Sequence, residues 1–149
     1  MTKDPFAPRP SIQKREARER AIELLYEAEV RGVSVDHVLS SQVIAPAQLV
    51  EELVKGVSAD VERIDAEIDA YLNEGWSLDR LGMLDLWILR IGIHELLLGD
   101  APVAVVINEA VELGNLFGAT EESGKFINGI LGTAARDMQW RDNRLPIGH

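Results

Sequence analysis

The sequence predicts an all-α fold, a single-domain bundle of about seven helices. Apolar residues recur every three or four positions through most of the chain, no segment shows the strict alternation of a strand, and proline and glycine separate the helical stretches. The 149 residues suit one domain, and 46% of them are hydrophobic, which is enough for one apolar core. There is no repeat of fixed period and no low-complexity segment.

The first helix is expected from Ile12 to about Glu29. Three prolines lie within the first ten residues, so we expect a flexible tail over residues 1–11 and an N-cap at Ser11. Gly32 should end the helix. Its buried stripe is predicted to contain Ala17, Ala21, Leu24, Leu25 and Ala28.

The middle of the chain predicts one short and one long helix. Ser34 can cap the short helix, and Pro46, at a first-turn position, can open the long one. The long helix should continue to Gly75, with a kink at Gly56. Its apolar stripe is Leu49, Leu53, Val57, Val61, Ile64, Ile68 and Leu72.

The second half of the chain predicts a single helical turn and three helices. Residues 77–81 form the turn, and residues 84–98 are apolar almost all the way round, which places that helix at the centre of the domain. An amphipathic helix over residues 103–117 should end at Gly118, and a last helix should run from Ser123 to about Met138. Residues 141–149 are expected to form a polar tail.

Composition indicates a cytoplasmic protein with an uneven charge. There is no cysteine, the N-terminus lacks a secretion signal, and no apolar run is long enough to cross a membrane. The net charge of −10 disfavours nucleic acid, but residues 1–20 hold six basic and three acidic side chains, so they carry +3 and the other 129 residues carry −13. The N-terminal segment is therefore basic, whereas the rest of the chain is acidic.

Neither catalysis nor a cofactor or metal site is expected. The three histidines, His37, His94 and His149, contain no pair at metal-binding spacing. Glu95 and Glu109 could act as acids or bases, but structural pairing of one of them with Arg90 is the stronger interpretation. The enzyme alternative predicts that replacing either glutamate with glutamine abolishes an activity.

Two pairs of glycines in helical stretches also need an explanation. No strand precedes Gly114 and Gly118, or Gly129 and Gly132, so neither pair suits a phosphate-binding turn. We expect both pairs to let helices approach closely.

The first helix carries a cluster of cations. On a helical wheel Lys14, Arg15 and Arg18 lie within roughly 100° of one another, beside the buried stripe and away from the acidic residues. Such a cluster can bind phosphates. By itself it is better explained as a charged face that keeps the protein in solution.

Two segments of the sequence carry a distinctive order of residues. One runs from Lys14 through Glu27. The other, from Leu78 onward, contains three ordered blocks: ILRIGIHEL at 88–96, VINEAVEL at 106–113 and SGKFINGIL at 123–131. Together they resemble the NusB family of bacterial transcription antitermination factors. The resemblance covers about residues 14–136 and is weakest over 33–75.

The resemblance implies a fold of two packed helical halves over residues 12–140 and a non-catalytic function. Family members pair with NusE, a small-subunit ribosomal protein, and together bind the boxA element of nascent RNA. The complex joins other Nus factors on RNA polymerase and supports ribosomal RNA synthesis. The resemblance assigns RNA contacts to Lys14, Arg15, Arg18, Ser123, Lys125 and Phe126, and contacts with NusE to Tyr26, Asp79 and Asp85.

The sequence departs from the family pattern at several points. Gln13 and Glu16 stand where arginines are frequent, which implies weaker RNA binding without NusE. The stretch before Ser123 is one residue longer than usual, and His94 stands where an aromatic residue is common.

Two alternative functions and one question of assembly accompany this interpretation. A helical adaptor that binds only protein would fit the net charge. It predicts that replacing Lys14, Arg15 and Arg18 with alanine has no effect. The related module of ribosomal RNA cytosine methyltransferases is not expected, because too little chain follows residue 140 for a cofactor-binding domain. A homodimer also remains open, with Trp87 or Trp140 contributing to it.

Overall fold

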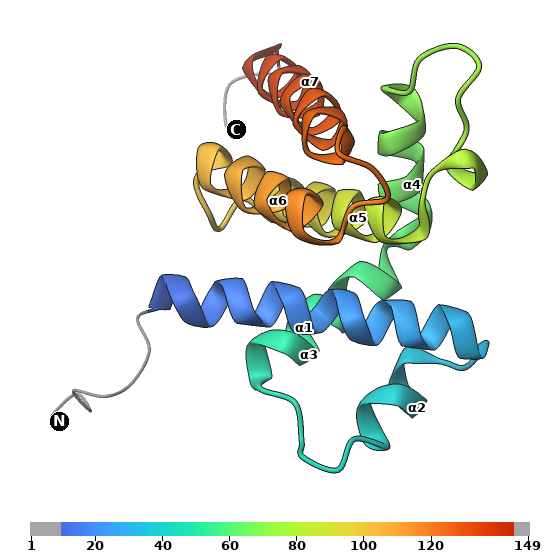
Figure 1. The fold of residues 1–149 in the computed structure, drawn as a ribbon. Helices are drawn as coiled ribbons and strands as arrows, with labels where there is room; N and C mark the ends of the chain where they lie inside the picture. Colours follow the sequence, from blue (N-terminus) through green and yellow to red (C-terminus); the bar gives the residue numbers. More distant parts are fainter. Residues whose placement is uncertain (1–9, 145–149) are drawn as a thin grey trace, which may run out of the picture. The chain divides into compact units, whose positions relative to one another are not determined.

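The computed structural model describes residues 10–144, so nearly all of the predicted N-terminal tail lies outside the described residues. Within this range the chain is entirely helical, with seven α-helices, one 3-10 turn and no strand, which confirms the predicted fold class (Figure 1). The elements are α1 (Pro10–Arg31), α2 (Val35–Ser40), α3 (Gln48–Ala59), α4 (Val61–Ala70), η1 (Leu78–Arg80), α5 (Met83–Leu98), α6 (Val103–Phe117) and α7 (Ser123–Arg144).

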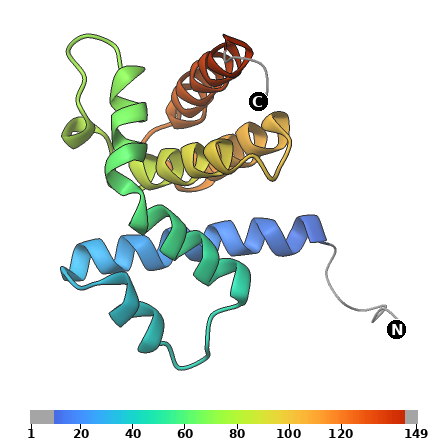
Figure 2. The same ribbon diagram turned by 180° about the vertical axis from the view of Figure 1, so that it is seen from behind.

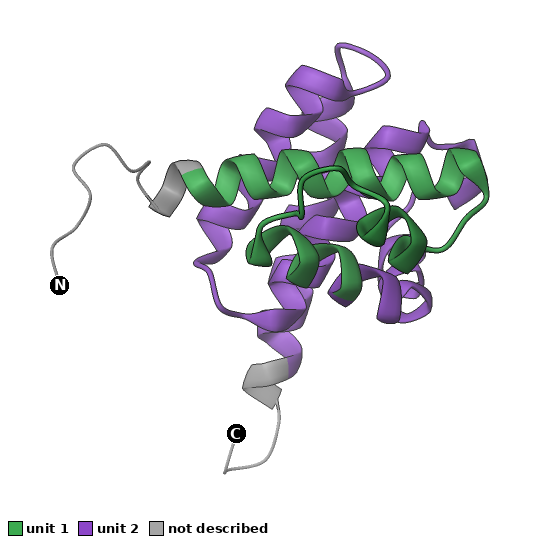
Figure 3. Ribbon diagram, turned by 90° about the horizontal axis from the view of Figure 1, so that it is seen from below, with its two compact units in different colours: residues 1–55 green, residues 56–149 purple. Residues whose placement is uncertain are grey.

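The chain divides into two compact units, residues 1–55 and 56–149 (Figure 3). In unit 1, α2 packs against α1. Ser34 caps α2 as predicted, because its Oγ accepts a hydrogen bond from the backbone N of His37 at 3.1 Å. The predicted α1 stripe is buried, and the buried apolar residues of this unit are Ala17, Ala21, Ile22, Leu24, Leu25, Ala28, Val38, Leu39, Val50 and Val54.

The predicted long helix is in fact two helices, and the break lies at Asp60 rather than at Gly56. Asp60 leaves helical geometry (φ −117°, ψ 18°) and precedes α4, where aspartate is a favoured N-cap residue. Gly56 lies inside α3. A Cβ at this position would lie 2.7 Å from Cε1 of His94, so the glycine is needed for space and not for a kink. The helical spacing of apolar residues continues across Asp60, so the sequence pattern does not reveal the break between α3 and α4.

Helix α5 is the central helix of unit 2, as its all-round apolar sequence predicts (Figures 1 and 2). It contacts α4, α6 and α7, and residues 85–89 and 91–93 are all buried. The expected close approach is confirmed at Gly114, whose Cβ would lie 3.3 Å from Cα of Gly124 in α7. The expected close approach of helices is wrong for the second pair, Gly129 and Gly132, since a Cβ added at Gly129 would meet nothing within 4 Å.

The helix ends of unit 2 differ from the expectation in two ways. Gly118 ends α6 as predicted, but with an extended backbone (φ −63°, ψ 155°) instead of the left-handed conformation typical of a glycine C-cap. Helix α7 continues to Arg144 and not only to about Met138, so the first part of the predicted polar tail is helical. Polar residues are compatible with a helix, and the next proline in the sequence is Pro146.

Candidate functional site

The first turn of α7 borders a pocket of about 390 Å³ in unit 2. The Ser123 hydroxyl lies at the edge of this pocket, where it donates a hydrogen bond to Asp85 Oδ2 at 3.0 Å and accepts one from the backbone N of Thr120 at 3.1 Å. The other carboxylate oxygen of Asp85 accepts from the backbone N of Ala119 at 3.1 Å. These bonds fix the turn between α6 and α7 to the start of α5.

This geometry corrects two residue assignments. Asp85 is 8% exposed and uses both carboxylate oxygens inside the unit, so it cannot present a charge to NusE as the resemblance implied. Ser123 is 2% exposed and holds the turn instead of offering its hydroxyl to RNA. Both residues position the beginning of α7.

The pocket has an aromatic side with a cation beside it. The ring centroids of Trp76 and Phe126 lie 6.4 Å apart, with the planes tilted by 42°. The guanidinium carbon of Arg80 lies 5.6 Å from the centroid of Trp76, within cation–π range. Phe126 is half-buried, so the expected aromatic edge at this place exists.

Three predicted contact residues are accessible. Lys125, in the first turn of α7, is exposed, and its Nζ lies 3.9 Å from Oε2 of Glu122. Asp79 is exposed in η1, where it accepts a hydrogen bond from Ser77. Tyr26 is 39% exposed on α1.

The predicted cationic cluster of α1 is only partly on the surface. Lys14 and Arg15 are exposed, whereas Arg18 is 4% exposed. Arg18 lies four residues before Ile22 and seven before Leu25, both buried, so it shares their side of the helix. The expectation that Arg18 projects to solvent is therefore wrong.

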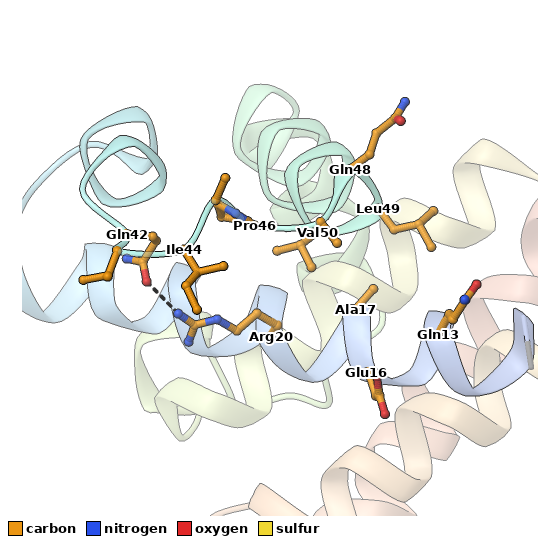
Figure 4. Close-up of a pocket in the computed structure, with 13 residues that line it drawn as sticks. Gln13, Glu16, Ala17, Arg20, Gln42, Ile44, Pro46, Gln48, Leu49 and Val50 are labelled. Atoms are coloured by element: carbon orange, nitrogen blue, oxygen red, sulfur yellow. Dashed lines mark hydrogen bonds between the residues drawn. The ribbon is translucent and has the colours of Figure 1, made fainter. Parts of the chain in front are cut away.

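A groove of about 830 Å³ lies in unit 1, between α1 and the segment that leads into α3 (Figure 4). Arg20 lies across it, and its Nη2 donates to Oε1 of Gln42 at 2.6 Å while Nη1 pairs with Glu23 at 3.0 Å. Ile44 and Leu49 line the groove and are exposed. The groove is mainly apolar and offers no set of catalytic groups.

Arg90, the expected partner of Glu95 or Glu109, forms a bidentate pair with Asp65 of α4, at 2.7 and 2.8 Å. Its guanidinium carbon lies 4.4 Å from the ring centroid of Trp87. The sequence did not predict Asp65 as a partner. Among the described side chains, which cover residues 13–141, no three metal-ligating groups converge. None of the described helices is long and apolar enough to span a membrane.

Sequence reasoning missed Trp76 and Arg80, and it misplaced Trp87. Trp87 is 8% exposed and unsuited to a dimer contact, whereas Trp140 is 55% exposed. A tryptophan placed directly after Gly75, in a polar segment between helices, was a detectable signal. Such a position is poorly suited to burial in the core.

These features define an all-helical protein of two units whose exposed cations and aromatic rings suit binding better than catalysis. A model of the NusB family matches residues 15–136. The chain belongs to the NusB family.

Individual relatives agree with this assignment. The transcription antitermination protein NusB of Anaeromyxobacter dehalogenans (strain 2CP-1) is 40% identical over 129 residues, which cover 82% of this chain and 89% of the relative. The protein of the same name from Listeria innocua is 37% identical over 127 residues, covering 83% and 97%.

Solved structures show the same fold. NusB of T. maritima matches with a TM-score of 0.74 and 33% identity over 83% of this chain and 91% of that one. A structure of the antitermination factors NusB and NusE in complex with dsRNA matches with a TM-score of 0.69 and 30% identity, covering 83% and 96%.

Proposed function

We propose that this protein is a transcription antitermination factor that binds the boxA element of nascent ribosomal RNA transcripts together with NusE, without catalysing a reaction. The observation that carries the proposal is the first turn of α7, where exposed Lys125 stands beside the aromatic pair of Phe126 and Trp76. A relative of 30% identity has been solved with NusE and dsRNA, which supports both partners.

The RNA contacts divide by chemistry between the two units. On α1, Lys14 and Arg15 supply cations for phosphates, which fix the position of RNA without reading its sequence. On α7, Lys125 adds a cation, and Phe126 offers an aromatic edge to an unpaired base. Ser123 contributes indirectly, by holding α7 in place.

Contact with NusE is proposed at Tyr26 and Asp79. Asp79 is an exposed carboxylate and suits a basic ribosomal protein. Tyr26 combines an apolar ring with a hydroxyl and is accessible, which is typical of interface residues. With both partners bound, the complex would act in the cytoplasm on RNA polymerase with other Nus factors. Self-association remains a prediction for sedimentation to test.

The test is a titration of boxA RNA and of a scrambled RNA of equal length, with and without NusE, at two salt concentrations. We expect a preference for boxA that grows when NusE is present. The double variant Lys14→Ala, Arg15→Ala should weaken binding to both RNAs and flatten the dependence on salt, because fewer counterions are released.

Lys55→Ala is the matched control, since Lys55 is also an exposed cation of unit 1. Its RNA affinity should stay close to that of the unaltered protein. Equal affinity for boxA and scrambled RNA in the presence of NusE would refute the proposal. Binding of NusE alone, insensitive to salt and to the double substitution, would favour the protein-binding adaptor.

A further inference from the structure

Trp76 lies exposed in a hydrogen-bonded turn between α4 and η1. The residue is 52% exposed although its ring is large and apolar. Its backbone N donates to the carbonyl of Asn73 at 3.0 Å, and Gly75, directly before it, has a φ of +89°. Arg80 donates a hydrogen bond to the carbonyl of Gly75. One backbone and one side-chain hydrogen bond therefore hold the turn in which the ring is exposed.

The surroundings of the ring combine flat surfaces with hydrogen-bonding groups. Phe126 lies on one side, and the planar guanidinium of Arg80 lies over the indole. Ser123 and Thr120 line the same pocket, and so does the buried carboxylate of Asp85.

These groups favour a nucleobase over a phosphate inside the pocket. The exposed carboxylate of Glu122 lines it and would repel a phosphate, whereas its oxygens can accept hydrogen bonds from the N–H groups at the edge of a base. The volume of about 390 Å³ is ample for one base. An exposed cation for a flanking phosphate is supplied by Lys125.

We propose that Trp76 and Arg80, together with Phe126, form a stacking site for one unpaired RNA base. This inference rests on the proposed function and extends it, since it adds two residues to the RNA contact and assigns them to a base instead of the backbone. Aromatic and guanidinium planes are the surfaces on which proteins stack splayed bases of single-stranded RNA.

The experiment compares Trp76→Ala, Trp76→Phe and Trp140→Ala in binding to boxA RNA, without NusE and with it. Trp140 is the matched control because it is a tryptophan of the same unit with a similar exposed fraction, 55%. Trp76→Ala should weaken RNA binding roughly 5- to 150-fold, the loss typical of one stacked base. Trp76→Phe should retain most of the affinity, and Trp140→Ala all of it.

A scan of abasic nucleotides identifies the base. At one position of boxA, removal of the base should weaken binding to the unaltered protein about as much as Trp76→Ala does, and should cause no further loss in that variant. Circular dichroism checks the folding of each variant. Arg80→Gln, which leaves the indole in place, should lose affinity severalfold and show the same non-additivity.

The outcomes separate this inference from the proposed function. If the unaltered protein prefers boxA but Trp76→Ala and Arg80→Gln bind it equally well, the stacking site is refuted and the function stands. If only the affinity for NusE falls, Trp76 is a protein contact and the inference is again refuted. If the unaltered protein shows no preference for boxA, the proposed function itself fails.

Discussion

The Ser123 hydroxyl donates a hydrogen bond to Oδ2 of Asp85 at 3.0 Å, which joins the first residue of α7 to the first turn of α5. Both side chains are buried. The second oxygen of Asp85 accepts from the backbone of Ala119, so one carboxylate holds both ends of the turn between α6 and α7. Lys125 and Phe126 follow directly in α7. Their position therefore depends on Asp85, although Asp85 itself need not contact a ligand.

Asp85→Ala should lower the free energy of unfolding by about 1–3 kcal/mol, because it leaves the Ser123 hydroxyl and the Ala119 amide without their acceptor. Urea denaturation followed by circular dichroism measures this change. Asp100→Ala, which removes an exposed carboxylate of the same unit, is the control and should have little effect. Equal stability of the two variants would show that the buried bonds are not important for the fold.

Replacement of Gly118 and of Gly129 with alanine should have opposite effects on stability. A Cβ at Gly118 would lie 2.2 Å from Cβ of Ser123 and 2.3 Å from the carbonyl oxygen of Gly114, so Gly118→Ala forces the turn apart. We expect a loss of about 1–3 kcal/mol. Gly129 lies inside α7 with open space around it, so Gly129→Ala should gain about 0.5–1 kcal/mol from helix propensity.

Thermal and urea unfolding of the two glycine variants give the comparison directly. The backbone of Gly118 has a φ of −63°, which any residue can adopt, so a loss there would report crowding alone. A gain in stability for Gly118→Ala would contradict the close approach of α6 and the start of α7.

The helices were predictable from the sequence because their signals are local. Apolar period, Ser34 as a cap and Gly118 as a stop all act within a few residues. The break at Asp60 was not predictable in this way, since Val57, Val61 and Ile64 keep the helical period through it. The interruption shows only in the backbone of Asp60, which leaves helical geometry (φ −117°, ψ 18°).

The candidate site was predictable in its residue types but not in their exposure. Arg18 shares a helix face with buried Ile22, and Asp85 is surrounded by donors that come from residues 119 and 123. A charged residue suggests a surface position, and only tertiary contacts reverse that expectation. Trp76 shows the converse, because an apolar residue that suggests the core is held outward by its turn.

Tyr71 should titrate late and stabilise the contact between α4 and α7. Burial, reinforced by the hydrogen bond that its hydroxyl donates to Asp137, raises the pKa of Tyr71 to about 12. Because the folded pKa lies above the ordinary value of about 10, this stabilisation is complete below pH 10 and is lost between about pH 10 and 12.

Ultraviolet titration of the phenol measures the effect. Tyr71→Phe should remove the late component and lower the free energy of unfolding by about 1 kcal/mol, whereas Tyr26→Phe should leave that component in place. A late component that survives in Tyr71→Phe would contradict the assignment. Arg141, which bonds Glu67 at 3.1 and 3.2 Å and Asp137 at 3.2 Å, would then remain as the link between the same helices.

His94 should make the fold less stable in mild acid. Burial lowers the pKa of His94 below its ordinary value of 6.5, against the opposing influence of Glu95 and Asp60. Below about pH 6.5 the unfolded chain therefore takes up a proton that the folded protein resists, and stability falls as the pH decreases toward the folded pKa. The slope is at most about 1.4 kcal/mol per pH unit, and above pH 6.5 this contribution is constant.

Denaturation curves between about pH 5.5 and 7.5, above the range in which most carboxylates titrate, isolate the histidine. His94→Gln should flatten the dependence, whereas His37→Gln, at an exposed position, should leave it unchanged. The ring of His94 also lies where a Cβ on Gly56 would stand, so protonation would place a charge against the backbone of α3. If the free energy of unfolding instead changes with pH equally in His94→Gln and in the unaltered protein, the acid sensitivity has another source. In that case burial of the imidazole does not disfavour its charged form.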